Sequence, residues 1–237
     1  MKKAALITGG ARRLGSAVAL ALAKKGYDIA LHCNRSEEEA VRTAKLIRRE
    51  GRNCEVFVCD LADPDERSGL IPAVYMCFPH CRLLVNNASV FERATLAETS
   101  PERFDRMMGI HLKAPFFLTQ SFASHFKKGH VVNFCDAKIA STFTTHFAYS
   151  LSKKALFEFT RMAAKALGPA MRVNAVAPGM ILPSREFNEA DLARLSMKIP
   201  LQRKGNAGDI VSAVLFLEEN DYITGECLFV DGGEHLK

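Results

Sequence analysis

Tyr149 and Lys153 stand four residues apart in a helix-like stretch, so both side chains are expected to project from one face of a helix. A tyrosine with its ordinary pKa of about 10 is a poor proton donor or acceptor at neutral pH. A neighbouring ammonium favours the phenolate, so we expect Lys153 to lower the pKa of Tyr149. The pair predicts proton-transfer chemistry, although ordinary amphipathic helices also carry this spacing by chance.

Asp136 follows the apolar run 131–135 and precedes Tyr149 by thirteen residues. It is expected at the carboxyl end of a strand, the edge where open α/β sheets place their ligands. An aspartate there repels a developing oxyanion, but it can accept hydrogen bonds from a ring nitrogen or relay a proton to it. This favours reduction of a C=N bond over reduction of a ketone. The alternative is an aspartate that only caps the next segment.

Residues 8–15, Thr-Gly-Gly-Ala-Arg-Arg-Leu-Gly, form a candidate phosphate-binding loop between an apolar run and an alanine-rich helical stretch. Its glycines let the backbone approach a pyrophosphate, and the helix N-terminus adds N–H donors. Arg13 stands where a dinucleotide loop usually has its middle glycine, so it adds a positive charge near cofactor phosphates or substrate. The alternative is a glycine-rich turn without a chemical role.

The segment from Ile29 to Ser36 contains no acidic residue. NAD-preferring folds place an Asp or Glu at the end of the second strand to bind the ribose 2′-hydroxyl. His32, Arg35 and Ser36 instead offer donors and charge, and an arginine is suited to gripping a phosphate. The sequence therefore predicts NADPH as the cofactor.

Strand-like and helix-like segments alternate along the chain, which predicts an α/β Rossmann fold of one domain over residues 1–237. It is expected to contain a doubly wound, seven-stranded parallel sheet with helices on both faces. Strands are expected at 3–8, 28–33, 54–59, 82–86, 130–135, 171–177 and 226–231. Helices are expected near 13–26, 36–50, 64–77, 102–127, 146–167 and 207–219. The long irregular region 178–206, with its three prolines, is a candidate substrate lid.

The composition is that of an ordinary globular protein. Apolar residues make up 48% of the chain and charged residues 24%, which argues against disorder, and no apolar run approaches the ~18 residues of a membrane helix. The net charge of +6 is dispersed among acids, so it favours a small anionic partner over nucleic acid. Seven cysteines, mostly in apolar runs, predict free buried thiols and a cytoplasmic location. Cys77, His80 and Cys81 lack a second ligand pair, so no metal is expected.

These residues together resemble the short-chain dehydrogenase/reductase family over nearly the full chain. The matching segments are 8–15, Asp60-Leu61, Asn86-Asn-Ala-Ser89, Tyr149-Ser-Leu-Ser-Lys153, 172–179 and Asp231-Gly-Gly233. Within the family, the chain looks most similar to the pteridine reductases and the bacterial dihydromonapterin reductases. The features that carry this narrower resemblance are Arg13, the segment 32–36, Ser89 with Phe91, and Asp136 in place of the usual catalytic serine.

The resemblance implies roles for particular residues. The implied cofactor-binding residues are Thr8, Gly9, Arg12, Arg13, Leu14, Gly15, His32, Asn34, Arg35, Ser36, Asp60, Leu61, Asn87, Ala88, Tyr149, Lys153, Pro178 and Gly179. The implied substrate-binding residues are Arg13, Ser89, Phe91, Asp136 and Tyr149. Phe91 either stacks on a flat pterin or packs as an ordinary core residue. Pro183 replaces the threonine that usually follows Pro178-Gly179, which puts contacts to the nicotinamide carboxamide there in doubt.

The implied catalytic residues are Asp136, Tyr149, Lys153 and His111. His111 stands where the family usually has an asparagine that supports a proton-relay water. It is either a relay itself, because its ordinary pKa lies near neutrality, or a packed core histidine.

The leading hypothesis is NADPH-dependent reduction of a dihydropterin (dihydromonapterin, dihydrobiopterin or dihydrofolate) to its tetrahydro form. The first alternative is a carbonyl reductase acting on a 3-oxoacyl group or another ketone, which Asp136 disfavours. The second is a non-catalytic NADP-binding regulator, which the presence of Tyr149 and Lys153 disfavours. The expected partners are a small pterin-like molecule and, by resemblance, further copies of the chain in a homotetramer.

Overall fold

The computed structural model describes residues 2–182 and 188–236. Within these residues, seven parallel strands form one sheet in the order β3-β2-β1-β4-β5-β6-β7. They are β1 (Lys3–Ile7), β2 (Tyr27–Cys33), β3 (Cys54–Val58), β4 (Cys81–Asn86), β5 (Gly129–Phe134), β6 (Met171–Pro178) and β7 (Cys227–Val230). Each strand agrees with its predicted bounds to within one residue, and the predicted Rossmann fold with a doubly wound parallel sheet is confirmed.

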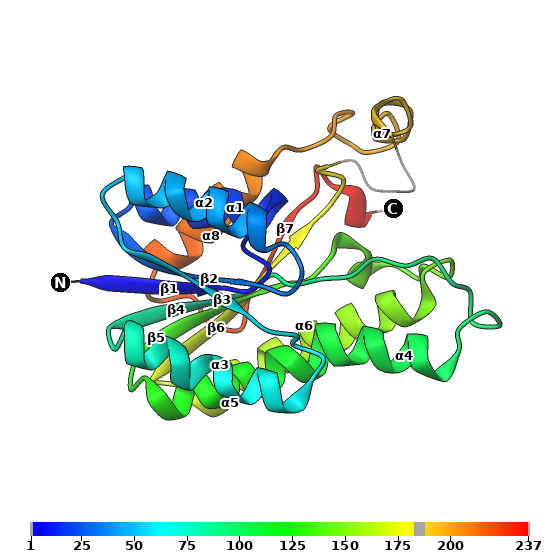
Figure 1. Cartoon of the computed structure of the whole chain (residues 1–237). Helices are drawn as coiled ribbons and strands as arrows, with labels where there is room; N and C mark the ends of the chain where they lie inside the picture. The colour runs from blue at the N-terminus through cyan, green and yellow to red at the C-terminus, as the bar shows by residue number, and fades with distance from the viewer. Residues whose placement is uncertain (1, 183–187, 237) are drawn as a thin grey trace.

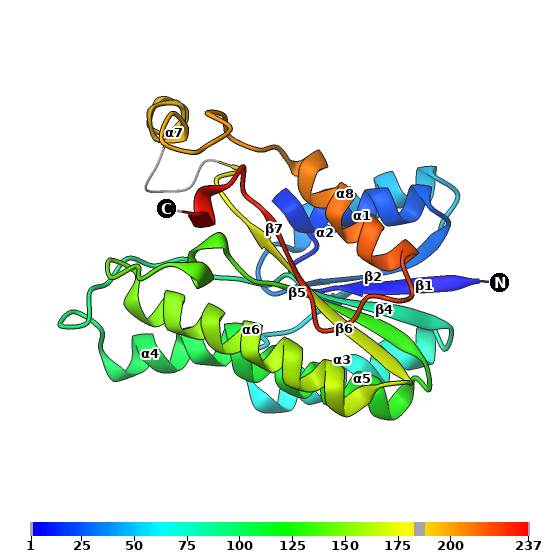
Figure 2. The same ribbon diagram turned by 180° about the vertical axis from the view of Figure 1, so that it is seen from behind.

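Helices cover both faces of the sheet (Figures 1 and 2). One face carries α1 (Arg13–Lys24), α2 (Glu37–Arg49) and α8 (Ala207–Glu219). The other carries α3 (Pro64–Cys77), α5 (Ala114–His125) and α6 (Phe147–Leu167), with α4 (Pro101–Met108) extending past the sheet. Two fully buried apolar clusters fill the layers, one around Ile7 and Leu31 and the other around Leu84 and Phe122. Burial of these clusters is the main force that holds the strand ends in register.

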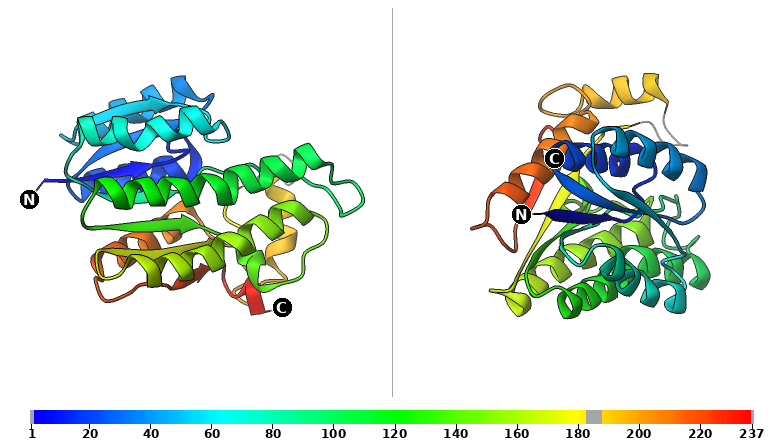
Figure 3. Two further views of the ribbon diagram at one scale, coloured as in Figure 1. Left: turned by 90° about the horizontal axis from the view of Figure 1, so that it is seen from below. Right: turned by 60° about the vertical axis from the view of Figure 1, so that its left-hand side comes forward.

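The predicted helix over 102–127 is interrupted by a π-helical segment, η1 (Gly109–Lys113). Pro115 lies in the first turn of α5 and has no N–H for the carbonyl of His111, and its ring would clash with that carbonyl in a regular helix. The wider π turn accommodates the proline, and such turns are frequent at functional sites. Figure 3 shows α4 and α5 continuing one another as a single long rod (left). The fully buried His111 lies in the middle of η1.

The expectation that residues 178–206 are irregular throughout was wrong, because α7 (Glu189–Ser196) lies in this region. Its start was readable in the sequence: Asn188 and Asp191 each accept a hydrogen bond from the other's backbone N–H, as a capping box does. Pro183 lies outside the described residues. The lid role of this region stays a prediction.

Three further properties of the described residues concern membrane-spanning helices, groups that could hold a metal ion and paired cysteines. None of their helices is long and apolar enough to cross a bilayer. They contain no group of three or more His, Cys, Asp or Glu side chains that could hold a metal ion. All seven cysteines are unpaired, and the buried ones, as predicted, form the majority: Cys33, Cys54, Cys81, Cys135 and Cys227.

Candidate active site

The candidate residues gather at the carboxyl edge of the sheet, where the strand order reverses between β1 and β4. In doubly wound sheets, the loops on either side of this reversal diverge and leave a crevice for a ligand. The loops that follow β1, β4 and β5 lie at this edge of the sheet. The N-terminal half of α6 brings Tyr149 and Lys153 to the same edge. The topology therefore joins segments that are far apart in the sequence.

The loop after β1 fits a dinucleotide phosphate because its backbone is bare where side chains would intrude. A Cβ atom added to Gly15 would lie 2.3 Å from the carbonyl oxygen of Gly9, and one on Gly9 would lie 2.9 Å from Cα of Ala88. Arg13 is exposed and begins α1 with φ of 57°, so it keeps the left-handed backbone that the usual glycine would adopt. The loop therefore combines a glycine-like conformation with a charged side chain.

Thr8 and Asn87 tie the loop after β1 to the loop after β4. The amide nitrogen of Asn87 donates to the carbonyl oxygens of Thr8 at 2.9 Å and of Gly9 at 3.0 Å. The hydroxyl oxygen of Thr8 accepts from the backbone N–H groups of Asn87 and Ala88, each at 3.0 Å. These predicted cofactor residues thus shape the two loops between which a dinucleotide would lie.

His32 supports the glycine loop from behind, which differs from the role expected for it. Its Nδ1 accepts from the Gly9 backbone N–H at 3.1 Å, so Nε2 carries the proton and donates to the carbonyl oxygen of Cys59 at 3.0 Å. The side chain is buried, and this burial lowers its pKa. A neutral imidazole with both nitrogens engaged offers no donor to a phosphate, so in this structure His32 fixes the loop, and a direct contact with the cofactor is not supported.

After the buried strand β2, Asn34 and Arg35 are exposed to solvent and Ser36 is half-buried. Among the acidic residues that begin α2, Glu39 lies 3.9 Å from Arg12 of the glycine loop. Beyond β3, the Asp60 carboxylate accepts from the Ala62 backbone N–H at 2.9 Å, and the adjacent Leu61 is buried. This corner carries cationic side chains at the point where a 2′-phosphate of NADPH would lie in this fold.

Asp136, Tyr149 and Lys153 converge at the carboxyl end of β5. The hydroxyl of Tyr149 donates to Oδ2 of Asp136 at 2.6 Å, and the other carboxylate oxygen accepts from the Lys138 backbone N–H at 2.9 Å. The ammonium of Lys153 donates to the carbonyl oxygen of Phe134 at 2.6 Å and lies 5.9 Å from the centre of the Tyr149 ring. Asp136 thus caps the short 3-10 helix η2 (Ala137–Ala140) and also accepts the hydrogen bond from Tyr149. The sequence left open whether this aspartate is a cap or a group of the reactive site, and in the structure it makes both kinds of contact.

The protein's own groups raise the pKa of Tyr149, which is opposite to the effect expected of Lys153, while the expected contribution of an oxidised nicotinamide stays a prediction. Burial is the largest cause, and together with the Asp136 carboxylate it raises the pKa of Tyr149 well above its ordinary value. Burial also lowers the pKa of Lys153. Before any ligand binds, Tyr149 is therefore a protonated donor held on a carboxylate.

His111 links the loop after β4 to helix α6. Its Nε2 accepts from the Val90 backbone N–H at 3.2 Å and lies 3.0 Å from the Ser89 hydroxyl, so the ring proton is on Nδ1. Nδ1 lies 2.9 Å from the Ser152 hydroxyl, which itself donates to the carbonyl oxygen of Tyr149 at 2.7 Å. Burial lowers the pKa of His111 well below its ordinary value. The structure thus engages both nitrogens, which favours the packed histidine over the relay.

Phe91 lies beside Tyr149, their ring centres 4.8 Å apart in an edge-on arrangement, and it stacks on His146 at 4.3 Å. Phe91 is 36% exposed, so part of the residue remains open to a ligand. The sequence reasoning did not identify His146, nor Lys138 and Phe143, whose side chains also meet here. Only the position of Lys138, two residues after Asp136, gave a signal for this group.

Pro178 ends β6 and Gly179 follows it, next to the last strand. A Cβ atom on Gly179 would lie 2.5 Å from Cβ of Asp231, and the Gly179 N–H donates to the carbonyl oxygen of Val230 at 3.1 Å. Asp231 in turn accepts from the backbone and ring of His235, each within 2.8 Å. Close backbone packing therefore explains this glycine, and its predicted cofactor contact stays a prediction.

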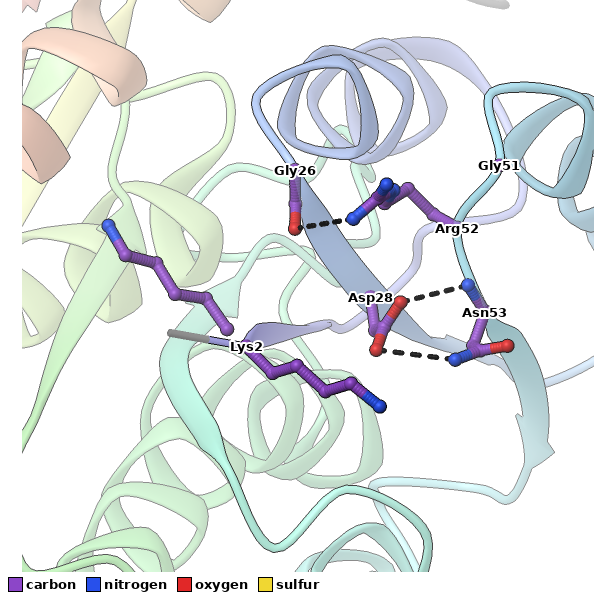
Figure 4. Close-up of a pocket in the computed structure, with 7 residues that line it drawn as sticks. Lys2, Gly26, Asp28, Gly51, Arg52 and Asn53 are labelled. Carbon is purple, nitrogen blue, oxygen red and sulfur yellow. Dashed lines mark hydrogen bonds between the residues drawn. The ribbon is translucent and has the colours of Figure 1, made fainter.

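A hollow at the opposite edge of the sheet lies outside this site (Figure 4). Its carboxylate, Asp28, accepts from the backbone N–H of Asn53 at 2.9 Å and from its amide at 3.4 Å. Arg52 donates to the carbonyl oxygen of Gly26 at 3.4 Å. These bonds join the amino ends of β2 and β3, so the hollow is a structural junction.

Three buried histidines should make the protein acid-sensitive. Burial lowers the pKa of His32, His111 and His130, whereas an unfolded histidine titrates near its ordinary pKa of about 6.5. Their contribution to stability is therefore complete above about pH 6.5 and is lost as the pH falls below it, since the unfolded chain then binds more protons. Each adds up to about 1.4 kcal/mol per pH unit to the fall in unfolding free energy.

Urea unfolding at pH 7.5, 6.5, 6.0 and 5.5 measures this slope. His111→Asn removes one titrating group and should flatten the curve in this range. A free energy of unfolding that is constant from pH 7.5 to 5.5 would contradict the expectation.

Comparison with known proteins identifies the family of the chain. A family model described as enoyl-(acyl carrier protein) reductase matches residues 9–235. The 3-oxoacyl-[acyl-carrier-protein] reductase FabG of Staphylococcus aureus is 30% identical over 244 residues, covering 100% of this chain and 99% of that protein. The chain belongs to the short-chain dehydrogenase/reductase family.

Solved structures place this short-chain dehydrogenase/reductase more narrowly. FolM alternative dihydrofolate reductase 1 from Brucella suis, in complex with NADP, superposes with a TM-score of 0.95 at 38% identity, over 99% of this chain and 95% of that one. A blue fluorescent protein from a metagenomic library, in complex with NADPH, has a TM-score of 0.89 at 31% identity, over 98% and 97%. The similarity to FolM supports the predicted pteridine reductase-like branch.

Proposed function

We propose that the protein uses NADPH to reduce the C=N bond of a dihydropterin to the tetrahydro form. The observation that carries this proposal is the 2.6 Å hydrogen bond from the Tyr149 hydroxyl to Asp136. A carboxylate at this position repels the oxyanion that ketone reduction develops, but it accepts hydrogen bonds from the N–H groups of a heterocycle. The similarity to FolM dihydrofolate reductases supports the same substrate class.

The chain's own groups supply orientation and the proton. A bound reduced nicotinamide supplies the hydride that adds to the ring carbon of the C=N bond. Asp136 accepts from substrate N–H groups and so orients the ring, while Tyr149 donates its proton to the neighbouring ring nitrogen. One hydride and one proton balance the reduction. The positive charge of Lys153, 5.9 Å from the Tyr149 ring centre, stabilises the phenolate that remains until Tyr149 regains a proton.

The decisive experiment is NADPH oxidation by purified protein with dihydromonapterin, dihydrobiopterin and dihydrofolate, beside a 3-oxoacyl thioester. Turnover of at least one dihydropterin with a higher kcat/KM than the ketone supports the proposal. Turnover of the ketone alone overturns it and favours the carbonyl reductase, which the similarity to FabG makes the second candidate. Cofactor binding without any turnover would identify a regulator.

Arg35 is expected to select NADPH over NADH. Because only NADPH carries a 2′-phosphate for its guanidinium, Arg35→Ala should raise the KM for NADPH about tenfold and leave the KM for NADH within about twofold. Arg49→Ala, an exposed arginine at the far end of α2, is the matched control. An equal change in KM for both cofactors would show that Arg35 does not recognise the 2′-phosphate.

We propose that the protein is a homotetramer located in the cytoplasm. Helices α4 to α6 carry large apolar side chains that are partly open to solvent in the single chain. They are Phe104, Phe116, Phe117, Leu151 and Met162, of which Met162 is 70% exposed. A second copy of this chain would cover these side chains, because burying such a surface is favourable.

Phe116→Glu is expected to break the assembly into smaller species, because it places a charge among these apolar groups. Light scattering during gel filtration at micromolar concentration gives the mass of each form. Val41→Glu adds the same charge at an exposed apolar position of α2, on the other face of the sheet, and should leave the mass unchanged. A wild-type monomer would contradict the proposed assembly.

A further inference from the structure

Three rings form an aromatic stack at the mouth of the candidate site: Phe91, His146 and Phe143. The ring centres of Phe91 and His146 lie 4.3 Å apart and those of Phe143 and His146 lie 5.2 Å apart, with interplanar angles of 24° and 19°. Backbone hydrogen bonds from Ala94 to Thr145 at 3.0 Å and from Phe147 to Ala94 at 2.9 Å join the two loops that carry these rings. The stack is therefore a platform built from two segments more than fifty residues apart.

Lys138 places its ammonium over this stack, 4.1 Å from the centre of the Phe143 ring and 5.3 Å from that of Phe91. Its backbone N–H donates to Asp136, so the same residue touches the catalytic carboxylate and the platform. The side chain is half-buried. Its position is thus fixed at both ends, within reach of a molecule that extends outward from Tyr149.

Among the described residues, no carboxylate lies within ion-pair distance of this ammonium. Asp136, two residues before Lys138, is engaged by Tyr149 and a backbone N–H, and Glu92, next to Phe91 in the sequence, is engaged by Arg106 at 2.8 Å and Arg103 at 3.6 Å. Aromatic faces compensate a partly buried cation only in part, so an anion that binds Lys138 gains a charge-assisted hydrogen bond. The molecule therefore presents an unmatched positive charge beside its reactive groups.

We propose that Lys138 determines substrate specificity by binding an acidic tail on the pterin. The preferred substrate carries its reducible ring at Asp136 and Tyr149, an aromatic spacer against Phe143, and a carboxylate on the Lys138 ammonium. A pterin with a short, neutral hydroxylated side chain gains nothing from this cation. The inference rests on the proposed function, and it selects among the dihydropterins those with an aromatic, acidic extension.

The test compares dihydrofolate, which has such a tail, with dihydrobiopterin, which does not. Lys138→Met keeps the length and apolar packing of the side chain but removes its charge. We expect it to lower kcat/KM for dihydrofolate about tenfold, mainly through KM, and to leave kcat/KM for dihydrobiopterin within about twofold. Lys138→Arg should retain most of the preference, and Lys165→Met, at an exposed position near the end of α6, should change neither value.

Two outcomes overturn the inference. Equal losses for both substrates would mean that Lys138 only supports the aromatic stack, and no loss for either would give it no part in recognition. Failure of the proposed function is distinguishable, because 4-aminobenzoyl-glutamate has the tail but no reducible ring. Calorimetry should show that this fragment binds the wild-type protein about tenfold more tightly than Lys138→Met, whatever reaction the enzyme performs.

Discussion

Replacing Tyr149 with phenylalanine is expected to lower kcat for a dihydropterin about 10³-fold. The substitution removes the O–H group that bonds to Asp136 at 2.6 Å and leaves the ring in place, so the loss reports the proton alone. General acid catalysis by a positioned group is worth about 10²–10⁴-fold, which sets the expected size. Stopped-flow NADPH oxidation at saturating NADPH measures the rate, and fluorescence titration of the variant gives its NADPH Kd, which separates any loss of cofactor binding from the loss of kcat.

Tyr75→Phe provides the matched control. Tyr75 is 40% exposed on α3, and its aromatic contacts are made by the ring, which phenylalanine keeps. It should leave kcat unchanged. If Tyr149→Phe retained more than a tenth of the wild-type kcat, the proton would have to come from another group, and Asp136 would be the first to examine.

Gly15→Ala is expected to abolish measurable NADPH binding and to destabilise the fold. The added Cβ would meet the carbonyl oxygen of Gly9 at 2.3 Å and the amide of Asn87 at 2.6 Å. Neither can move without breaking the bonds between Asn87 and the loop, so the phosphate cradle must distort. We expect a loss of about 1–3 kcal/mol in unfolding free energy, as overpacking typically costs, together with an NADPH Kd raised at least about 100-fold.

Gly69→Ala is the control for this substitution. A Cβ at Gly69 meets nothing within 4 Å, and the residue lies in the interior of α3, so alanine should stabilise the protein by about 0.5–1 kcal/mol. Calorimetric unfolding and NADPH titration of both variants give the comparison. A Gly15→Ala protein that binds NADPH normally would show that the loop is not the phosphate site.

The sheet was predictable because strands buried on both faces are short apolar runs, and the spacing of these runs fixes the order of the elements. The pairing of Tyr149 with Lys153 follows from helical periodicity, which is local. The proximity of Asp136 to Tyr149 depends on the placement of α6 beside the end of β5, which the family resemblance supplied. These are the features for which a local pattern or a familiar order carries the information.

The remaining features depend on contacts that no local pattern encodes. Groups at least 21 residues away in the sequence engage both ring nitrogens of His32 and of His111. The ordinary pKa of histidine, near neutrality, gives no sign of these contacts. The platform of Phe91, His146 and Phe143 forms only when two loops meet. The π turn at His111 has a sequence signal in Pro115, but its geometric result requires the packed helix.

At position 13, backbone stability favours glycine, whereas the positive charge beside the phosphate loop requires arginine. A residue other than glycine with φ of 57° costs about 1 kcal/mol, and Arg13 lies exposed rather than packed in the core. A search for stabilising substitutions would therefore choose glycine here and would discard the charge next to the phosphate cradle. Among variants at position 13, thermostability and cofactor affinity should therefore change in opposite directions.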